Sequence, residues 1–278
     1  RIVQIGNDGI RQSENFNNIA IMKKVVLLTL GVVLFFSSCR RKTGPDCCPP
    51  VEPIGSIEVH LNHLWGTDTI VRGTGKYLTA QGDTVTISDI RGLLSNFVLK
   101  FTDGSDFPLE YYHYYKLSTA STNTFLLKGI PDEVYQKMSF FLGLDSTSNH
   151  SDVTTYPRTS ALSTYQAGGE MHWNWADGFI FTNVTGTYRP ANASRFRGFS
   201  YHIGMDPNLV KISLPTNGLT ISGNSRLMEL NVDWKEMFES PNSIKIANQD
   251  VTHSTSGDTL AAQLSANMVD MVKIGSIK

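Results

Sequence analysis

The sequence predicts an all-β protein, built as a two-sheet β-sandwich with one short helix near its C-terminus. Short apolar runs rich in β-branched and aromatic residues recur along residues 54–278, and Gly, Asn, Asp and Pro separate them. Helical periodicity is confined to two short stretches. A unit of about 220 residues is also long enough to bury a sizeable core between two sheets.

The expected strands are short and evenly spread along the domain. They are predicted at 56–61, 84–90, 97–102, 111–117, 123–128, 136–144, 178–186, 197–203, 209–214, 218–221 and 227–232. Asp103-Gly104 and Asn217-Gly218 are strong signals for tight turns, because these residue types tolerate a positive φ angle.

Two stretches carry a helical pattern. The first is 233–239, for which Asp233 is the expected N-cap. The second is 259–271, in which four apolar residues share one face and should pack on a sheet: Leu260, Leu264, Met268 and Met271. The segment 146–169 is polar and has no periodicity, which fits either a functional loop or a surface excursion without a role.

The N-terminal region has the organisation of an export signal. Residues 22–24 are Met-Lys-Lys, an apolar run follows at 25–36, and two serines then precede Cys39. This run is shorter than the roughly 20 residues that a membrane-spanning helix needs. We therefore expect 22–38 to be a lipoprotein signal peptide and Cys39 to be the lipidated residue, although an ordinary signal peptide with an incidental cysteine is the alternative.

The rest of the N-terminal region has no folding pattern. Residues 1–21 are a polar leader that we exclude from fold reasoning. Residues 39–53 read as a tether, charged and rich in proline. Because Arg40 and not an aspartate follows Cys39, anchoring in the outer membrane is favoured, with the domain in the periplasm or at the cell surface.

Composition excludes several classes of function. The formal net charge of −1 argues against nucleic acid as a partner. The vicinal Cys47 and Cys48 precede the domain and are a poor ligand pair without others nearby, and no cysteine follows them. No nucleophile elbow, phosphate loop or zinc-protease motif is present, so we do not expect an enzyme, although the fold could still assemble a carboxylate pair.

The residues best suited to a site are histidines and tryptophans. Of the seven histidines, His60, His63 and His202 lie in or near apolar strand segments. Imidazole is a common ligand of copper and zinc, but a lone histidine in a strand is more often a structural residue. Trp173 and Trp175 stand two residues apart, so in an extended segment both indoles would project from the same face, either as core packing or as part of a site.

Several of these segments resemble a known family. Met171-x-Trp173-x-Trp175 is similar to the Met-x-Trp-x-Trp motif of the MbnP-like family of periplasmic copper-binding proteins. Further segments match that family in the same order: 59–66, 90–97, 141–145, 199–204 and 264–268. The resemblance spans roughly residues 54–272, and it departs from the family where Asp177 replaces a commoner Ser and Phe179 a commoner Tyr.

The resemblance implies a buried mononuclear copper site with histidine ligands in a β-sandwich. We expect His63 and His202 to be the metal ligands, brought together beside the tryptophans. His60 competes with His63 but should face the other side of an ideal strand, and His253 is a third candidate in a polar loop.

In some family members a di-haem peroxidase-like partner oxidises a tryptophan to kynurenine. The resemblance therefore makes Trp173 or Trp175 a candidate for oxidation or for lining the site, together with Met171. His172 lies between the tryptophans and should face away from them.

The sequence thus predicts an extracytoplasmic copper-binding lipoprotein for copper acquisition, storage or handover, attached to the membrane by its lipid anchor only. The alternative is a metal-free cell-surface module that binds a glycan or a partner protein. Its stacking platform would consist of five exposed aromatic residues: Trp65, Tyr111, Tyr112, Tyr114 and Tyr115.

Overall fold

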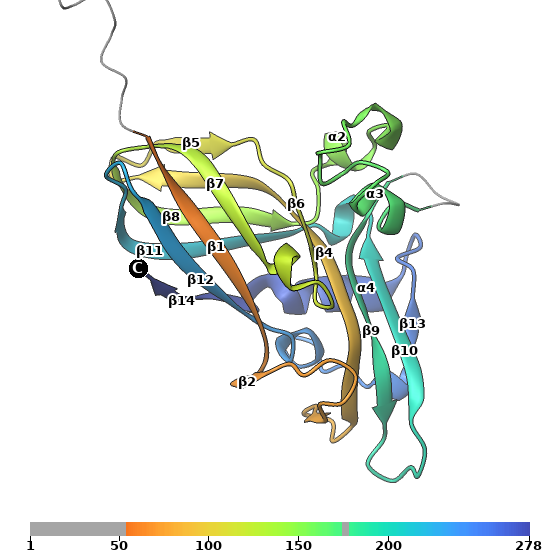
Figure 1. Cartoon of the computed structure of the whole chain (residues 1–278). Helices are drawn as coiled ribbons and strands as arrows, with labels where there is room; N and C mark the ends of the chain where they lie inside the picture. The colour runs from red at the N-terminus through yellow and green to blue at the C-terminus, as the bar shows by residue number, and fades with distance from the viewer. Residues whose placement is uncertain (1–53, 174–177) are drawn as a thin grey trace, which may run out of the picture. The chain divides into compact units, whose positions relative to one another are not determined.

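The structure is a computed structural model that describes residues 54–173 and 178–278, and it is built of two β-sheets (Figure 1). The predicted leader, signal peptide, lipidated Cys39 and tether lie outside the described residues, as does Trp175. Within the described part of the chain, no helix is both long and apolar enough to cross a membrane.

The five-stranded sheet is centred on β1, which pairs in parallel with β12 and antiparallel with β7 and β2. Its strands are β1 (Ile54–Trp65), β2 (Asp68–Thr69), β7 (Thr124–Pro131), β12 (Ser225–Asp233) and β14 (Val272–Ile277). Side chains alternate along β1, and those at 57, 59, 61, 63 and 65 are buried. This period of two is what a strand with one core-facing side requires.

The nine-stranded sheet is centred on the long strand β4 and follows the order β11-β8-β4-β9-β10-β13. These strands are β4 (Thr84–Phe101), β8 (Val134–Leu142), β9 (Ile180–Arg189), β10 (Arg197–Gly204), β11 (Val210–Thr220) and β13 (Val251–Thr252). Three short strands pair with β4 off this path: β3 (Tyr77–Leu78), β5 (Asp106–Leu109) and β6 (His113–Lys116).

The main hydrophobic core takes buried side chains from both sheets. Val59 of β1, Phe97 of β4 and Tyr201 of β10 are fully buried in this one cluster. Its aromatic members pack edge-to-face or stacked, as for Phe97 with Phe140 at a centroid distance of 5.2 Å. The predicted all-β sandwich is confirmed.

The strands predicted at 84–90 and 97–102 are one strand, β4. Between the two predicted segments, Asn96 has a φ of 52°. The pairing of β4 with β8 shifts register there, between Ser95 and Val98, and then resumes. Ser95 is fully buried, and its hydroxyl donates a hydrogen bond to the carbonyl of Gly143 at 2.7 Å. The Ser-Asn pair is therefore a β-bulge that bends the strand and does not end it.

The two predicted turns have different outcomes. Asp103-Gly104 forms a turn between β4 and β5, with Gly104 at a φ of 89°. Asn217 and Gly218 also have positive φ angles, of 51° and 82°, but they lie inside β11, where the pairing with β8 shifts register. The separate strands predicted at 209–214 and 218–221 are consequently one strand.

Helices are few and short. They are α2 (Ser146–Asn149), α3 (Ala167–Glu170) and α4 (Thr259–Asn267), with 3-10 turns at Ala120–Asn123, Val153–Thr155, Asp206–Asn208, Glu236–Phe238, Ile246–Asn248 and Met268–Asp270. The C-terminal helix is confirmed, and all four residues of its predicted apolar face are buried.

The helix predicted at 233–239 is wrong. Asp233 ends β12, and its carboxylate accepts hydrogen bonds from the backbone amides of Gly66 and Lys235. Only the 3-10 turn Glu236–Phe238 follows, because Trp234, Met237 and Phe238 are drawn into the main core. Tertiary packing thus outweighs a short helical pattern.

The segment 146–169 is packed against the outer face of the nine-stranded sheet. It forms a second, smaller hydrophobic cluster in which Leu162, Ala167 and Met171 are fully buried against Leu93 of β4 and Phe181 of β9. In Figure 1 the segment, with α2 and α3, lies beside the upper ends of β9 and β10. The loop is therefore a structural cover, and Trp173 follows directly from it.

Candidate metal centre

Two of the predicted histidines lie next to each other, His202 in β10 and His253 directly after β13. The short strand β13 pairs in parallel with β10, so that Tyr201 is opposite Thr252. His202 and His253 each follow the last residues of this pairing. Their ring centroids are 5.0 Å apart and their planes are nearly perpendicular, at 86°.

The indole of Trp173 lies beside both imidazoles. Its ring centroid is 5.9 Å from that of His202 and 6.2 Å from that of His253. Trp173 is only 6% exposed, whereas His253 is exposed and His202 is half-buried. The three rings therefore form a compact group, which we call the histidine–tryptophan cluster, with one side open to solvent.

Hydrogen bonds of the Ser254 side chain hold the loop of His253 against β10. The buried hydroxyl of Ser254 donates to the carbonyl of His202 at 2.9 Å and accepts from the amide of Gly204 at 3.0 Å. Ser254 has a φ of 50°, which turns the chain away immediately after His253. One serine thus fixes the position of His253 relative to His202.

The spacing His202-x-Gly204 has a packing reason. A Cβ atom on Gly204 would lie 2.6 Å from the carbonyl oxygen of Phe179 and 3.4 Å from Nε1 of Trp173. Only a residue without a side chain lets the tryptophan segment come this close to β10. The glycine therefore makes room for Trp173 beside His202.

The segments 171–173 and 178–180 pair with each other, and we call this pair of segments the tryptophan hairpin. The amide of Trp173 donates to the carbonyl of Gly178 at 3.1 Å, and the amide of Ile180 donates to the carbonyl of Met171. The buried Asn149 of α2 accepts from the amide of Phe179 at 2.7 Å and donates to Asp206 at 2.7 Å. These contacts give Trp173 a defined position on the sheet.

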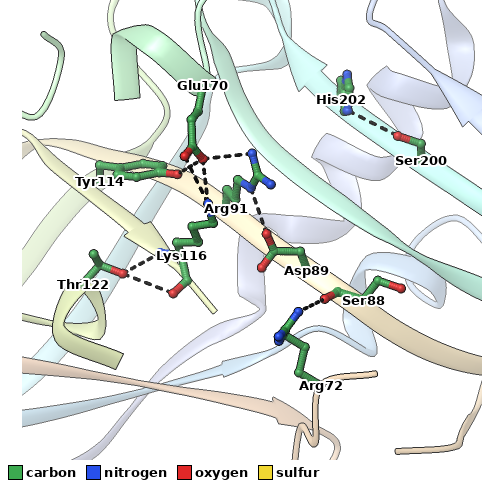
Figure 2. Close-up of polar contacts among 10 residues, drawn as sticks. All are labelled: Arg72, Ser88, Asp89, Arg91, Tyr114, Lys116, Thr122, Glu170, Ser200 and His202. Atoms are coloured by element: carbon green, nitrogen blue, oxygen red, sulfur yellow. Dashed lines mark hydrogen bonds and ion pairs between the residues drawn. The ribbon is translucent and has the colours of Figure 1, made fainter. Parts of the chain in front are cut away.

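The environment of His202 keeps its imidazole neutral. Burial lowers the pKa of His202 to about 4, and the nearby His253 and the positive charge of Arg91 act in the same direction. Its Nε2 atom is 3.2 Å from the hydroxyl of Ser200 (Figure 2), while Nδ1 is buried and has no hydrogen-bond partner within the described part of the chain. In the tautomer whose Nε2–H donates to Ser200, the unused Nδ1 of the neutral imidazole retains a lone pair for a ligand.

His63 lies elsewhere in the fold. It belongs to β1 and faces the main core, with 5% exposure, while His202 alternates with the core residues Tyr201 and Ile203 and faces away from that core. The Nδ1 atom of His63 accepts from the indole of Trp234 at 2.9 Å, and Nε2 lies 3.0 Å from Asn123. The structure therefore does not bring His63 together with His202, and both its ring nitrogens already have partners.

The other candidates are separate from the cluster. His60 alternates with His63 as expected, and its Nε2 atom lies 2.7 Å from the carboxylate of Glu58 on the outer side of β1. His172 packs edge-on against Phe179 at 5.0 Å. Met171 is fully buried in the second hydrophobic cluster beneath the tryptophan hairpin.

The aromatic platform of the alternative module is formed only in part, because two of its five rings lie in the core. Trp65 and Tyr115 are 5% and 3% exposed and belong to the main core, and Tyr111, Tyr112 and Tyr114 are only half-buried. Trp65 stacks on Tyr77 at a centroid distance of 5.5 Å and donates to the carbonyl of Leu78. Packing in the core removes Trp65 and Tyr115 from the surface, and the three half-buried tyrosines remain partly accessible.

Sequence reasoning ranked His253 below His63. His253 follows a strand of two residues, and the partner strand β10 lies some fifty positions earlier, so neither periodicity nor local spacing indicates their contact. The described residues contain no group of three or more His, Cys, Asp or Glu side chains arranged for a metal ion. The site that the structure offers is thus a pair of imidazoles beside an indole.

Similarity to known proteins shows the family of this chain. The family model MbnP matches residues 54–256, which is more than half of the chain. No curated protein matches. Among solved structures, MbnP from Methylosinus trichosporium matches with 16% sequence identity and a TM-score of 0.49, over 76% of this chain and 87% of that chain. On the strength of the family model, this chain belongs to the MbnP family.

Proposed function

We propose that the protein binds a single copper ion at the histidine–tryptophan cluster, with His202 and His253 as ligands. The observation that carries the proposal is the contact between these two imidazoles, 5.0 Å apart at their centroids, beside the buried Trp173. His63, the other ligand expected from the resemblance, is replaced by His253 in this proposal because its nitrogens are bonded to Trp234 and Asn123.

The residues fit copper chemically. Imidazole nitrogen suits both Cu(I) and Cu(II), and the buried Nδ1 of His202 is a donor atom without a partner among the described residues. Because the pKa of His202 lies near 4, a proton does not compete for this nitrogen at neutral pH. The half-buried setting limits access of water and influences the redox couple of the bound metal.

Trp173 would line the site or be its oxidised residue. The indole nitrogen can only donate a hydrogen bond and is not a metal ligand. Oxidation to kynurenine would break the C2–C3 bond of the indole and release C2 as formate, with peroxide as the oxidant. It leaves an aromatic amine and a ketone, either of which can approach a metal. Trp173 lies beside the two histidines, which supports it as the modified residue, and a di-haem peroxidase-like protein is the partner that this step would need.

The role of the protein would be acquisition, storage or handover of copper outside the cytoplasm, with no catalytic reaction of its own. The export signal predicted at 22–38 and the lipidation predicted at Cys39 support a membrane-anchored protein in the periplasm or at the cell surface. An exposed His253 supports exchange of the metal, because one ligand is accessible from solvent.

Copper titration of the purified protein tests the proposal. We expect the wild-type protein to bind a single copper ion and His202→Gln and His253→Gln to lose that binding, because each variant removes one of two imidazole ligands. His60→Gln is the matched control: it lies on the outer side of β1 beside Glu58 and should bind as the wild-type protein does. Full binding by both cluster variants, or no binding by the wild-type protein, would contradict the proposal, and the second result would favour the metal-free module.

A further inference from the structure

A row of polar side chains crosses the outer face of the nine-stranded sheet and ends at the histidine–tryptophan cluster. Arg91 of β4 is paired with Lys116 of β6 on one side and with Asn183 of β9 on the other. Asn183 is in turn paired with His202 of β10. Directly paired residues project from the same face of a sheet, about 5 Å apart, so Arg91 is two such steps and Lys116 three such steps from His202.

Glu170 lies over the cationic end of this row. Its carboxylate is 2.9 Å from Arg91 Nη1 and 2.9 Å from Lys116 Nζ, and it accepts a hydrogen bond from the hydroxyl of Tyr114 at 2.7 Å. Figure 2 shows the three side chains converging on the carboxylate, while Asp89 binds the other side of Arg91 at 2.9 Å. We call these four residues, Glu170, Arg91, Lys116 and Tyr114, the Glu170 clamp.

Glu170 is the counter-ion that both cations of the clamp share. Arg91 and Lys116 are direct cross-strand neighbours of like charge, an arrangement that is unfavourable without a counter-ion. Partial burial would raise the pKa of Glu170, but the hydrogen bonds from Tyr114 and Lys116 and the charges of Arg91 and Lys116 outweigh it, so this pKa lies below its ordinary value. Glu170 is therefore ionised at neutral pH.

Glu170 is also the residue that leads into the tryptophan hairpin. It ends α3, the buried Met171 follows, and Trp173 is three positions further on. The return side of the hairpin is held by Asn149 through the amide of Phe179. The entry side is held to the sheet by the clamp, so the hairpin is fixed at both ends.

We propose that Glu170 is a positioning residue, which holds Trp173 against His202 and His253 by clamping the entry of the tryptophan hairpin to Arg91, Lys116 and Tyr114. Its consequence for copper rests on the proposed function, but its consequence for the position of Trp173 does not. Glu170 touches neither imidazole in any contact of the described residues, so it acts through Trp173 and through the charge balance of the row.

The test is Glu170→Gln, which keeps the shape of the side chain and removes its charge. In the metal-free protein, we expect the amide protons of Trp173 and Ile180 to exchange with solvent about five- to tenfold faster, with little change in the thermal midpoint, because a local anchor is lost. In the copper-loaded protein, we expect about tenfold weaker Cu(II) binding and an altered Cu(II) electron paramagnetic resonance spectrum, as for loss of a residue that orients a metal site.

Glu229→Gln is the matched control. Glu229 of β12 also accepts from a hydroxyl and a lysine, Ser276 and Lys278, but it lies on the five-stranded sheet. This variant should leave the exchange of Trp173 and the copper spectrum unchanged. If Glu170→Gln fails to fold, Tyr114→Phe removes only one hydrogen bond of the clamp and should shift both readouts in the same direction by a smaller factor.

The outcomes separate the two proposals. Exchange at Trp173 that is the same in Glu170→Gln as in the wild-type protein would overturn the clamp, whatever copper does. Faster exchange in a protein that binds no copper would support the clamp and refute the copper site. Faster exchange with an unchanged copper affinity and spectrum would also overturn the positioning role, since the metal site would then not depend on where Glu170 holds Trp173.

Discussion

At the scale of single residues, the neighbours of His63 and His202 give these two histidines different roles. His63 accepts from Trp234 and contacts Asn123, so it bridges β1 to two other segments of the fold. Burial lowers its pKa, and the hydrogen bond with Asn123 only partly opposes this. The pKa of His202 is also lowered, but its Nδ1 atom has no hydrogen-bond partner among the described residues. Satisfied hydrogen bonding distinguishes a structural histidine from a candidate ligand.

His113 provides a prediction for the pH dependence of stability. Its ring stacks on Phe125 at a centroid distance of 4.2 Å, and its Nε2 atom donates to the carbonyl of Thr122 at 2.7 Å. Burial lowers its pKa to about 4 from an ordinary value of 6.5, although the hydrogen bond to Thr122 opposes the shift. Between these two pH values the unfolded chain binds more protons at this site, so the free energy of unfolding should fall as the pH falls.

Below about pH 4 the contribution of this histidine should level off, after a loss on the order of 3 kcal/mol, at about 1.4 kcal/mol per unit of pKa shift. Urea unfolding at several pH values measures it. His113→Phe retains the stacking on Phe125 and should lose stability less steeply than the wild-type protein between pH 6.5 and 4. His63 and His202 titrate in both proteins, so the difference isolates His113, and parallel profiles would contradict the prediction.

At the scale of elements, the sequence predicts where strands lie better than where they end. Alternation of buried and exposed residues identifies β1 and β10, because a sheet with one covered face imposes it. Bulges are not visible in the same pattern. Asn96 falls between two predicted strands and Asn217-Gly218 in a predicted tight turn, yet all three residues lie within continuous strands whose register shifts there.

Gly204 provides a prediction at this scale. Gly204→Ala places a methyl group 2.6 Å from the carbonyl oxygen of Phe179, so the tryptophan hairpin must move away from β10. We expect a loss of stability of about 1–3 kcal/mol, typical of overpacking, together with weaker copper binding. Chemical denaturation and copper titration measure the two effects.

Gly198→Ala is the control for this change. Gly198 is in the same strand, and a Cβ atom there would meet nothing within 4 Å. This variant should change neither stability nor copper binding appreciably. Equal effects of the two substitutions would mean that strand propensity, and not the contact with the hairpin, is responsible.

At the scale of the whole molecule, the fold class could be predicted from the sequence and the assembly of the site only in part. The resemblance indicated Trp173 and His202, which lie side by side in the structure. The resemblance also paired His202 with His63, but the two residues belong to different sheets. His63 points into the main core between the sheets, and His202 points away from that core on the outer face of the nine-stranded sheet. The contact with His253 depends on a parallel pairing between β10 and β13, which no local pattern in the chain encodes.

The structural role of segment 146–170 can be seen only in the complete fold. By sequence it is a polar stretch without periodicity. In the structure it contributes to the second hydrophobic cluster, and its Asn149 and Glu170 hold the two sides of the tryptophan hairpin. Sparse apolar residues such as Leu162 suffice to bury it, since the sheet supplies most of the apolar partners.

One measurement tests directly whether a single copper ion contacts both His202 and His253. Pulsed electron paramagnetic resonance of the Cu(II)-loaded protein detects coordinated imidazoles directly through their remote nitrogens. We predict coupling to two imidazoles in the wild-type protein and to a single one in any copper that His253→Gln or His202→Gln retains. A spectrum that neither substitution alters would contradict the account.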